Sequence, residues 1–190
     1  PSRKPAFLSG LLATVDELKT CRITPEQLWT AGEESGGGEG DKLRDLGLIC
    51  GTYDALSAQV ALDPRDRLTR TAEKLKEHPW AQGMDLWLDG FTDFTPQQRE
   101  VLRHLMRQAD SLTVTLTCDH LEEDEGGAGI FSPARRTAAG LLRLAAQEGI
   151  SCEVEHLVPD WDKRCEPLRQ VEKQLFAHGE AEPVSCQGRG

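Results

Sequence analysis

The sequence predicts an α/β protein in which a block of helices precedes a partial parallel sheet. In residues 1–80, apolar side chains recur at helical spacing. Residues 81–158 then alternate short apolar runs with capped helical segments, in the order strand, helix, strand, helix, strand. That order favours parallel strands joined by right-handed crossovers. A complete nucleotide-binding sheet normally has more strands, so the sheet is expected to be partial and truncated at its front.

The first block is expected to hold a series of amphipathic helices. Thr24 and Asp63 are each followed by proline, a residue favoured at the first helical position, so both are predicted N-caps. The glycine-rich stretch 31–40 is expected to be a flexible loop. The helices flanking these features are predicted within residues 5–21, 24–29, 41–60 and 63–77.

The second block should contain three strands, each followed by a helix. Thr95 with Gln98 forms a capping-box pattern, Ser132 is a predicted cap and Gly149 a predicted helix stop. Trp87 and Leu88 should point to opposite faces of the central strand, and a buried Trp87 is expected. The expected strands span residues 84–91, 111–118 and 150–158, and the helices span 95–109, 132–149 and 167–179. Residues 159–190 are thus assigned an exit helix and a disordered tail.

Composition restricts the function. The 190 residues carry a net charge of −10, whereas a freestanding nucleic-acid binder is usually basic. Neither a run of 18 apolar residues nor a signal peptide is found, so a cytoplasmic protein without membrane contact is expected. The chain starts at a proline and is expected to be a piece of something longer.

The 6 cysteines contain no C-x-x-C pair, so we expect reduced, mostly buried thiols and no metal. Asp119 and His120 adjoin an acidic loop, but no second ligand group has convincing spacing for a metal site.

Asp89 raises the question of an ATP site, because it follows the apolar strand residues 86–88. A strand-end aspartate can hold the magnesium of a nucleotide, and an adjacent glutamate can activate water. Here the neighbour is Gly90. No stretch fits the phosphate loop G-x-x-x-x-G-K-[ST], including the glycine-rich residues 35–42. Asp-Gly is also a common turn pair, so the dipeptide by itself is a weak signal.

The longer segment "WLDGFTDFTPQQREVL", residues 87–102, is more specific. It resembles the second helicase motif of the AddB family, which forms one of the two subunits of the AddAB-type ATP-dependent helicase/deoxyribonuclease. Further segments in the same order extend the resemblance over about residues 5–178.

The resemblance implies part of a superfamily-1 helicase-like (RecA-like) domain with a preceding helical subdomain. Asp89 would be a vestigial metal position, Gly90 would stand in place of the general base, and Thr92 would replace a glutamine. These replacements remove the groups that activate and sense the attacking water. The segment is therefore expected to be no enzyme by itself, and to scaffold the complex and line its DNA path.

For the parent protein, the resemblance implies a heterodimer with an AddA partner that repairs DNA double-strand breaks for recombination. It would act as an exonuclease and ATP-dependent nuclease on DNA. ATP, magnesium and an iron–sulfur cluster would belong to regions outside these residues, and no cofactor is expected here.

Two arginine groups are candidate DNA contacts. Arg99, Arg103 and Arg107 recur every fourth residue on one predicted helix, and Arg135 and Arg136 begin the next. For the first group, a solvated face that pairs with acids such as Glu100 is favoured over DNA contact. An unrelated α/β interaction or regulatory module remains the alternative function at this point.

Overall fold

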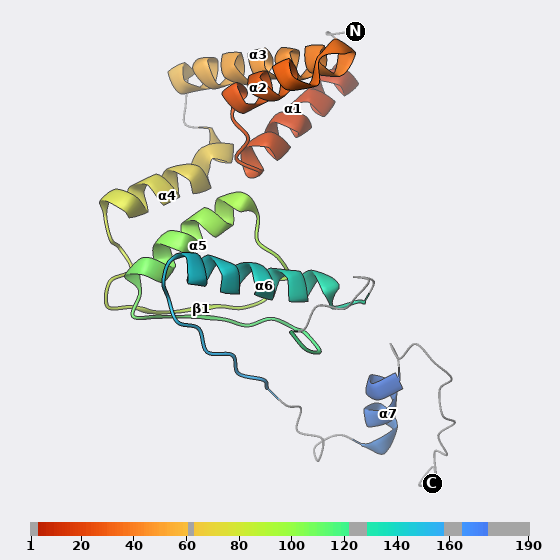
Figure 1. The fold of residues 1–190 in the computed structure, drawn as a ribbon, viewed down its shortest axis with the longest axis vertical. Helices are drawn as coiled ribbons and strands as arrows, with labels where there is room; N and C mark the ends of the chain where they lie inside the picture. The colour runs from red at the N-terminus through yellow and green to blue at the C-terminus, as the bar shows by residue number, and fades with distance from the viewer. Residues whose placement is uncertain (1–3, 61–62, 122–128, 158–164, 175–190) are drawn as a thin grey trace.

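The computed structural model describes residues 4–60, 63–121, 129–157 and 165–174, and most of them are helical (Figure 1). The strands are β1 Asp85–Leu88 and β2 Ser111–Val114. The helices are α1 Pro5–Thr20, α2 Pro25–Ser35, α3 Gly37–Val60, α4 Arg67–Glu77, α5 Pro96–Gln108, α6 Ser132–Gln147 and α7 Glu166–Gln174, with a short 3-10 helix, η1 Pro64–Asp66, before α4.

Helices α1, α2 and α3 pack together at the N-terminal end of the molecule (Figure 1). Their core is formed by Val15, Leu28 and Cys50, one residue from each helix. The N-cap of α2 is confirmed, since the Thr24 hydroxyl accepts the backbone N–H of Gln27 in a capping box. Apolar spacing and caps therefore specify this block, as the sequence predicts.

The predicted loop at residues 31–40 is wrong. Helix α2 continues to Ser35, and α3 begins at Gly37 after a tight turn. Gly36 and Gly37 adopt φ values of 63° and 56°, a left-handed backbone that glycine reaches without strain. The glycines on either side of the turn lie where the two helices come close together. A Cβ added to Gly32 would lie only 2.8 Å from the carbonyl oxygen of Gly40. The glycine-rich composition thus allows two helices to approach closely and does not indicate a flexible connector.

Lys19 joins α1 to α3 and η1 through a group of acids. Its Nζ atom lies 2.7 Å from Asp54, 3.1 Å from Asp63 and 2.8 Å from Asp66. Burial by itself lowers the pKa of Lys19, but hydrogen bonds to the three carboxylates outweigh it and raise the pKa above its usual value. Lys19 is therefore a fixed positive charge that holds three segments together.

Helix α5 is attached to α4 by side-chain amides at both of its ends. Near its start, the Gln97 Nε2 donates to the backbone oxygen of Arg65 at 3.0 Å and to the Thr69 hydroxyl at 3.1 Å. At its end, the Gln108 Nε2 donates to the backbone oxygen of Leu75. We call these bonds the amide clamp. Together they fix the helical block against the segment that carries the sheet.

A salt bridge adds to this contact. Arg22, just after α1, lies 2.7 Å from Glu100 on α5. Burial raises the pKa of Glu100, but Arg22 and Arg103 more than offset this and keep the pKa below its usual value.

The sheet consists of β1 and β2 in parallel, with Asp85 opposite Ser111 and Leu88 opposite Val114. The two expected strands and their parallel pairing are confirmed, although both are shorter than predicted. The third strand is wrong over residues 150–157, which have no regular structure, and residue 158 lies outside the described residues. A strand requires a neighbouring edge to take its hydrogen bonds, and this stretch has none among the residues described.

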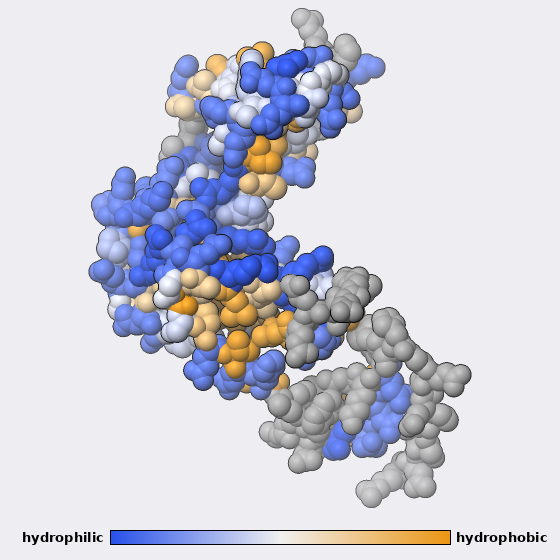
Figure 2. All heavy atoms as spheres, viewed as in Figure 1, coloured by the Kyte–Doolittle hydropathy of each residue, from blue (hydrophilic) through white to orange (hydrophobic). Residues whose placement is uncertain are grey.

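Trp87 is 69% exposed, so the expected buried indole is also wrong. The strand alternates as predicted, with Leu86 and Leu88 half-buried and Asp85 and Trp87 exposed. Figure 2 shows apolar residues gathered over α6 and the strands, below the polar surface of α5. Parallel sheets are normally covered on both faces, and here Trp87 lies on the uncovered face.

Trp87→Ala should therefore change the stability of the 190-residue chain by less than about 1 kcal/mol, because a mostly exposed side chain loses little burial. The comparison is Leu102→Ala on α5, which is 3% exposed and should cost roughly 2–5 kcal/mol. Urea denaturation of both variants measures the difference. A loss above about 3 kcal/mol for Trp87→Ala, typical of a buried aromatic residue, would contradict the exposed position.

Two further predicted helix boundaries are confirmed, whereas the predicted tail after residue 174 lies outside the described residues. Thr95 caps α5 in a capping box with Gln98, and Gly149 ends α6 with φ 69°. The cap of α6 is Phe131, and Ser132 is its first residue, so the expected Ser132 cap is one residue off. Of the cysteines in the described residues, all are free but only Cys50 is buried, contrary to the mostly buried set expected. Cys186 lies outside the described residues.

Candidate functional site at the end of strand β1

Asp89 follows β1 directly and is anchored to the next strand. Its carboxylate accepts a short hydrogen bond from the hydroxyl of Thr115, the residue after β2. The Thr115 backbone N–H also donates to the Leu88 oxygen at 3.0 Å, so the pairing of the two strands extends to this point. The Asp89 carboxylate thus helps to hold the ends of the two strands together.

Gly90 has a left-handed backbone, with φ 78°. A side chain at this position would meet no atom within 4 Å, so space is not the constraint. The constraint is conformational, because residues with a Cβ rarely adopt this backbone. A glutamate in place of Gly90 would therefore be strained by the backbone at this position.

The turn after Gly90 is held by aromatic and polar contacts. Phe91 stacks on Phe94 with ring centroids 4.9 Å apart, and Phe94 is buried. From α6, the Thr137 hydroxyl donates to the Thr92 backbone oxygen at 3.0 Å. Because the turn is fixed from both sides, the geometry at Asp89 and Gly90 is set by the surrounding fold.

Arg135 is only 3% exposed and binds within the protein. Its Nη1 lies 2.8 Å from His120 Nε2 and 3.8 Å from an Asp119 oxygen. Burial raises the pKa of Asp119. The His120 backbone N–H and Arg135 lower this pKa by more than burial raises it, so the pKa of Asp119 lies below its usual value. No group of three or more possible metal ligands occurs in the described ranges. Arg135 is thus directed at neighbouring side chains, while Arg136 is exposed.

The arginines of α5 are partly engaged by acids. Arg103 lies 3.0 Å from Glu100 and 3.2 Å from Glu148, and Arg107 forms a short ion pair with the same Glu148. Arg99 is exposed. The expected pairing with Glu100 is therefore observed, and Glu148 extends it to the end of α6.

Residues 1–175 match the family described as "ADDB, N-terminal". The chain belongs to this AddB family. Its relatives include the B-type subunit of the ATP-dependent helicase/deoxyribonuclease of Thermoanaerobacter sp. (strain X514), 34% identical over 182 residues, which covers 93% of this chain and 16% of the relative. The corresponding protein of Moorella thermoacetica is 37% identical over 157 residues, 78% of this chain and 14% of the relative.

Membership of the AddB family decides between the alternatives left by the sequence. An unrelated interaction or regulatory module is set aside, and the resemblance is confirmed. This AddB-family chain spans only about 16% of the length of its relative from Thermoanaerobacter. In the described part, no helix is both long and apolar enough to cross a membrane.

Two residues of the site were missed by sequence reasoning. Thr115, which binds Asp89, lies within the predicted strand 111–118 and directly follows the observed β2, and parallel pairing brings it beside the end of β1. Glu148, which binds Arg103 and Arg107, lies just beyond the last turn of α6. Only Thr115 could have been found from the sequence, because the register of two strands can be estimated from it. The crossing of α5 and α6, which brings Glu148 to the arginines, cannot.

Proposed function

We propose that this chain is a non-catalytic, helicase-like part of an AddB protein that scaffolds a DNA-repair helicase–nuclease and lines its DNA path. The names of its relatives support a role as one subunit of a complex, alongside an AddA partner. ATP, magnesium and the iron–sulfur cluster would then be bound by other regions of the complex. A RecA-like arrangement of the sheet is part of the same proposal.

The observation that carries the proposal is the strand end itself. Asp89 is bonded to the Thr115 hydroxyl, and the next residue is a glycine with φ 78°. ATP hydrolysis requires a metal-binding acid together with a group that positions the water. At this strand end, the acid accepts the Thr115 hydroxyl, and the next position has a backbone unfavourable for glutamate.

The test is ATP turnover by the intact two-protein complex. Asp89→Asn retains the shape of the side chain and an acceptor for Thr115, so the turnover should stay within about twofold of wild type, whereas loss of a true magnesium ligand reduces phosphoryl transfer by orders of magnitude. Thr115→Val is the matched control, because it removes the hydroxyl that binds Asp89 without removing a carboxylate. A more than tenfold loss, roughly 1.4 kcal/mol, in Asp89→Asn alone would refute the non-catalytic role.

For DNA, the isolated chain should show no measurable binding at about 150 mM salt, with dissociation constants weaker than roughly 100 μM. Its charge of −10 opposes a polyanion, and Glu148 already engages Arg103 and Arg107. Fluorescence anisotropy with single- and double-stranded oligonucleotides across a salt series measures this. Micromolar binding that disappears in the Arg99/Arg103/Arg107→Ala triple variant would show that α5 binds DNA directly.

A further inference from the structure

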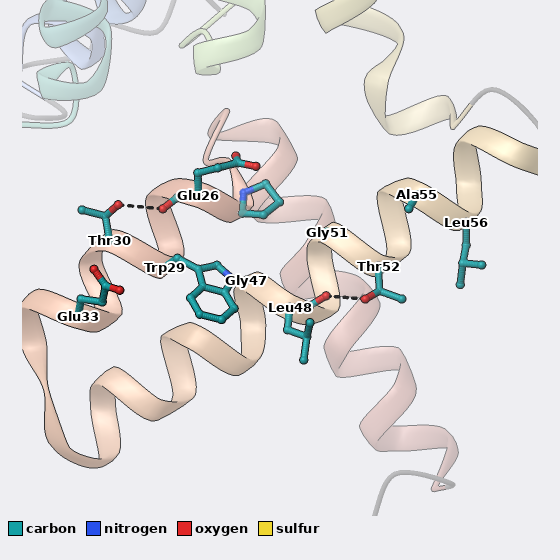
Figure 3. A pocket seen from close by; sticks show the side chains of 11 residues that line it. Glu26, Trp29, Thr30, Glu33, Gly47, Leu48, Gly51, Thr52, Ala55 and Leu56 are labelled. Atoms are coloured by element: carbon teal, nitrogen blue, oxygen red, sulfur yellow. Dashed lines mark hydrogen bonds between the residues drawn. The ribbon is translucent and has the colours of Figure 1, made fainter.

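Helices α1, α2 and α3 form one closely packed unit, here called the three-helix unit. The apolar side chains packed around its core of Val15, Leu28 and Cys50 come from the same three helices, namely Leu18, Leu43, Leu46 and Tyr53. In the described residues, this cluster takes no member from α4, α5 or α6. Figure 3 shows Trp29 of α2 beside Gly47 of α3, where an added Cβ would lie 2.6 Å from the indole. Such close packing keeps the shape of the unit fixed.

Helix α4 belongs with α5 and the sheet, because the amide clamp joins it to α5. Gln97 bonds η1 at the backbone oxygen of Arg65 and also bonds the start of α4, while Gln108 bonds α4 near its end. A side chain of α6 bonds the turn before α5. Residues 63–121 and 129–147 therefore form a second unit, the sheet unit, which lies below the three-helix unit in Figure 1.

Oppositely charged side chains join the two units at the end of α1. Among residues 4–60 and 63–121, no backbone hydrogen bond runs from one unit to the other. Asp16, Lys19 and Arg22 follow one another every third residue, and each faces an opposite charge of the sheet unit. The contacts are Asp16–Arg65 at 3.0 Å, Lys19–Asp63 at 3.1 Å, Lys19–Asp66 at 2.8 Å, Arg22–Glu100 at 2.7 Å and a hydrogen bond from Arg65 to the Tyr53 hydroxyl at 3.3 Å.

Lys19 is the buried centre of this joint. Lys19 and Asp63 expose only 11% and 3% of their side chains, and Asp54 of the three-helix unit lies 2.7 Å from the same Nζ atom. An ammonium group is a compact charge with three donors on a flexible stem, so its bonds hold over a range of orientations. Lys19 can therefore keep the two units attached while one turns relative to the other.

The two outer pairs, Asp16–Arg65 and Arg22–Glu100, flank Lys19 and are more exposed. Asp16 and Arg22 expose 59% and 40% of their side chains. A guanidinium group is planar and bonds in fixed directions, so each pair favours one orientation of the units, but exposed ion pairs contribute little free energy. The observed angle between the units thus depends on weak contacts.

Arg22 also has an unusual backbone for an arginine. With φ 59°, it ends α1 in the left-handed conformation that glycine usually adopts, and the Ile23 N–H donates to the Leu18 oxygen at 2.8 Å. A residue with a Cβ is strained in this conformation. An arginine here therefore costs conformational free energy, which the contact with Glu100 across the joint offsets.

We propose that the joint at the end of α1 is a hinge whose angle responds to ionic strength. The three-helix unit turns about Lys19 as one body, and the two outer pairs hold it in the observed orientation. Opening an exposed ion pair returns both charges to water, whereas opening an apolar core exposes hydrocarbon, so the joint yields before either unit does. Salt screens the outer pairs and weakens them further. This hinge goes beyond the proposed function and does not rest on it.

Distances between pairs of spin labels in the full-length AddB-family protein test the hinge without ATP or DNA. The labels are attached to p-acetylphenylalanine, because the chain has exposed free cysteines. Ala13→p-acetylphenylalanine on α1 and Arg143→p-acetylphenylalanine on α6 measure the distance across the joint. The same change at Ala13 and Leu48 measures a distance within the three-helix unit, and at Lys76 and Arg143 a distance within the sheet unit. All four positions are exposed.

Arg22→Gln combined with Arg65→Gln removes one partner of each outer pair. We expect the share of molecules outside the main distance across the joint to rise at least about threefold, while both distances within the units stay unchanged. Raising the salt from about 0.1 M to about 1 M should act in the same direction on the wild type, since the Debye length falls from about 10 Å to about 3 Å.

The matched control is Arg44→Gln combined with Arg107→Gln. It removes the same two charges, but Arg44 pairs with Asp41 inside the three-helix unit and Arg107 pairs with Glu148 inside the sheet unit. The distance across the joint should therefore stay as in the wild type.

Three results would overturn the hinge. One is a distance across the joint that stays as narrowly distributed as the distances within the units, both in the Arg22/Arg65 variant and in high salt. Another is an equal broadening of the distances within the units, which would indicate local unfolding. The third is an equal response of the control variant, which would show that the pairs across the joint have no special effect.

Discussion

Lys19→Met should destabilise the chain by roughly 3 kcal/mol, because it removes the cation shared by three aspartates and leaves their carboxylates close together. Asp63 has only 3% of its side chain exposed, so its unpaired charge would be costly, whereas Asp54 and Asp66 can be hydrated at 43% and 36%. The partial hydration places the expected loss at the lower end of the range for a broken buried pair. Urea denaturation at neutral pH measures it.

The stability lost in Lys19→Met should become smaller as the pH falls into the acid range. Burial raises the pKa of Asp63. The Arg65 backbone N–H and Lys19 lower this pKa by more than burial raises it, so the pKa of Asp63 in the folded chain lies below the unfolded value of about 4. The stability contributed by Asp63 is thus present above about pH 4 and is lost as the pH falls through the folded pKa. The raised pKa of Lys19 makes its contribution complete below about pH 10 and lost as the pH rises further.

The difference between wild type and Lys19→Met should consequently be constant from about pH 5 to 10 and shrink in acid. Lys76→Met on the exposed surface of α4 is the control and should stay within about 0.5 kcal/mol of wild type. A pH-independent loss would contradict the assignment of the lost stability to the charge of Lys19.

Gly40→Ala should destabilise the chain by about 2 kcal/mol, although alanine is the better helix former by about 1 kcal/mol. The added methyl group would overlap the carbonyl oxygen of Gly32, a backbone atom of the facing helix that cannot rotate away. Helices α2 and α3 would have to separate to make room for it. The free energy of unfolding from urea titration measures the net effect.

The matched control is Gly10→Ala in the middle of α1, where an added Cβ meets nothing within 4 Å. The same substitution should there stabilise the chain by about 0.5–1 kcal/mol through helix propensity. Opposite signs for the two glycines would establish close helix contact at Gly40. A stabilising effect at both positions would mean that the α2–α3 turn is looser than the structure shows.

Local signals in the sequence predicted local structure well. The caps at Thr24 and Thr95 and the stop at Gly149 each depend on neighbouring residues, and all three are found. The glycines of residues 32–40 were misread because composition cannot distinguish a flexible loop from a close helix crossing. Trp87 was misread because an apolar strand was assumed to be covered on both faces, whereas coverage depends on segments distant in the chain.

The candidate site was predictable in its position and less so in its geometry. The place of Asp89 after a strand could be deduced from the apolar run before it. The left-handed backbone of Gly90 and the burial of Arg135 could not, because both depend on how the turn packs against α6 and the segment before it. The exposed Arg99 and Arg136 stay candidates for DNA contact in the full complex.

The amide clamp has a mechanical consequence. Gln97 bonds Thr69 and Gln108 bonds Leu75, both on α4, from opposite ends of α5, so the two helices resist rotation about each other as well as separation. Helix α5 starts only a few residues after Asp89, at the turn that α6 also holds. If the end of β1 moved and carried α5 with it, α4 would have to move together with α5.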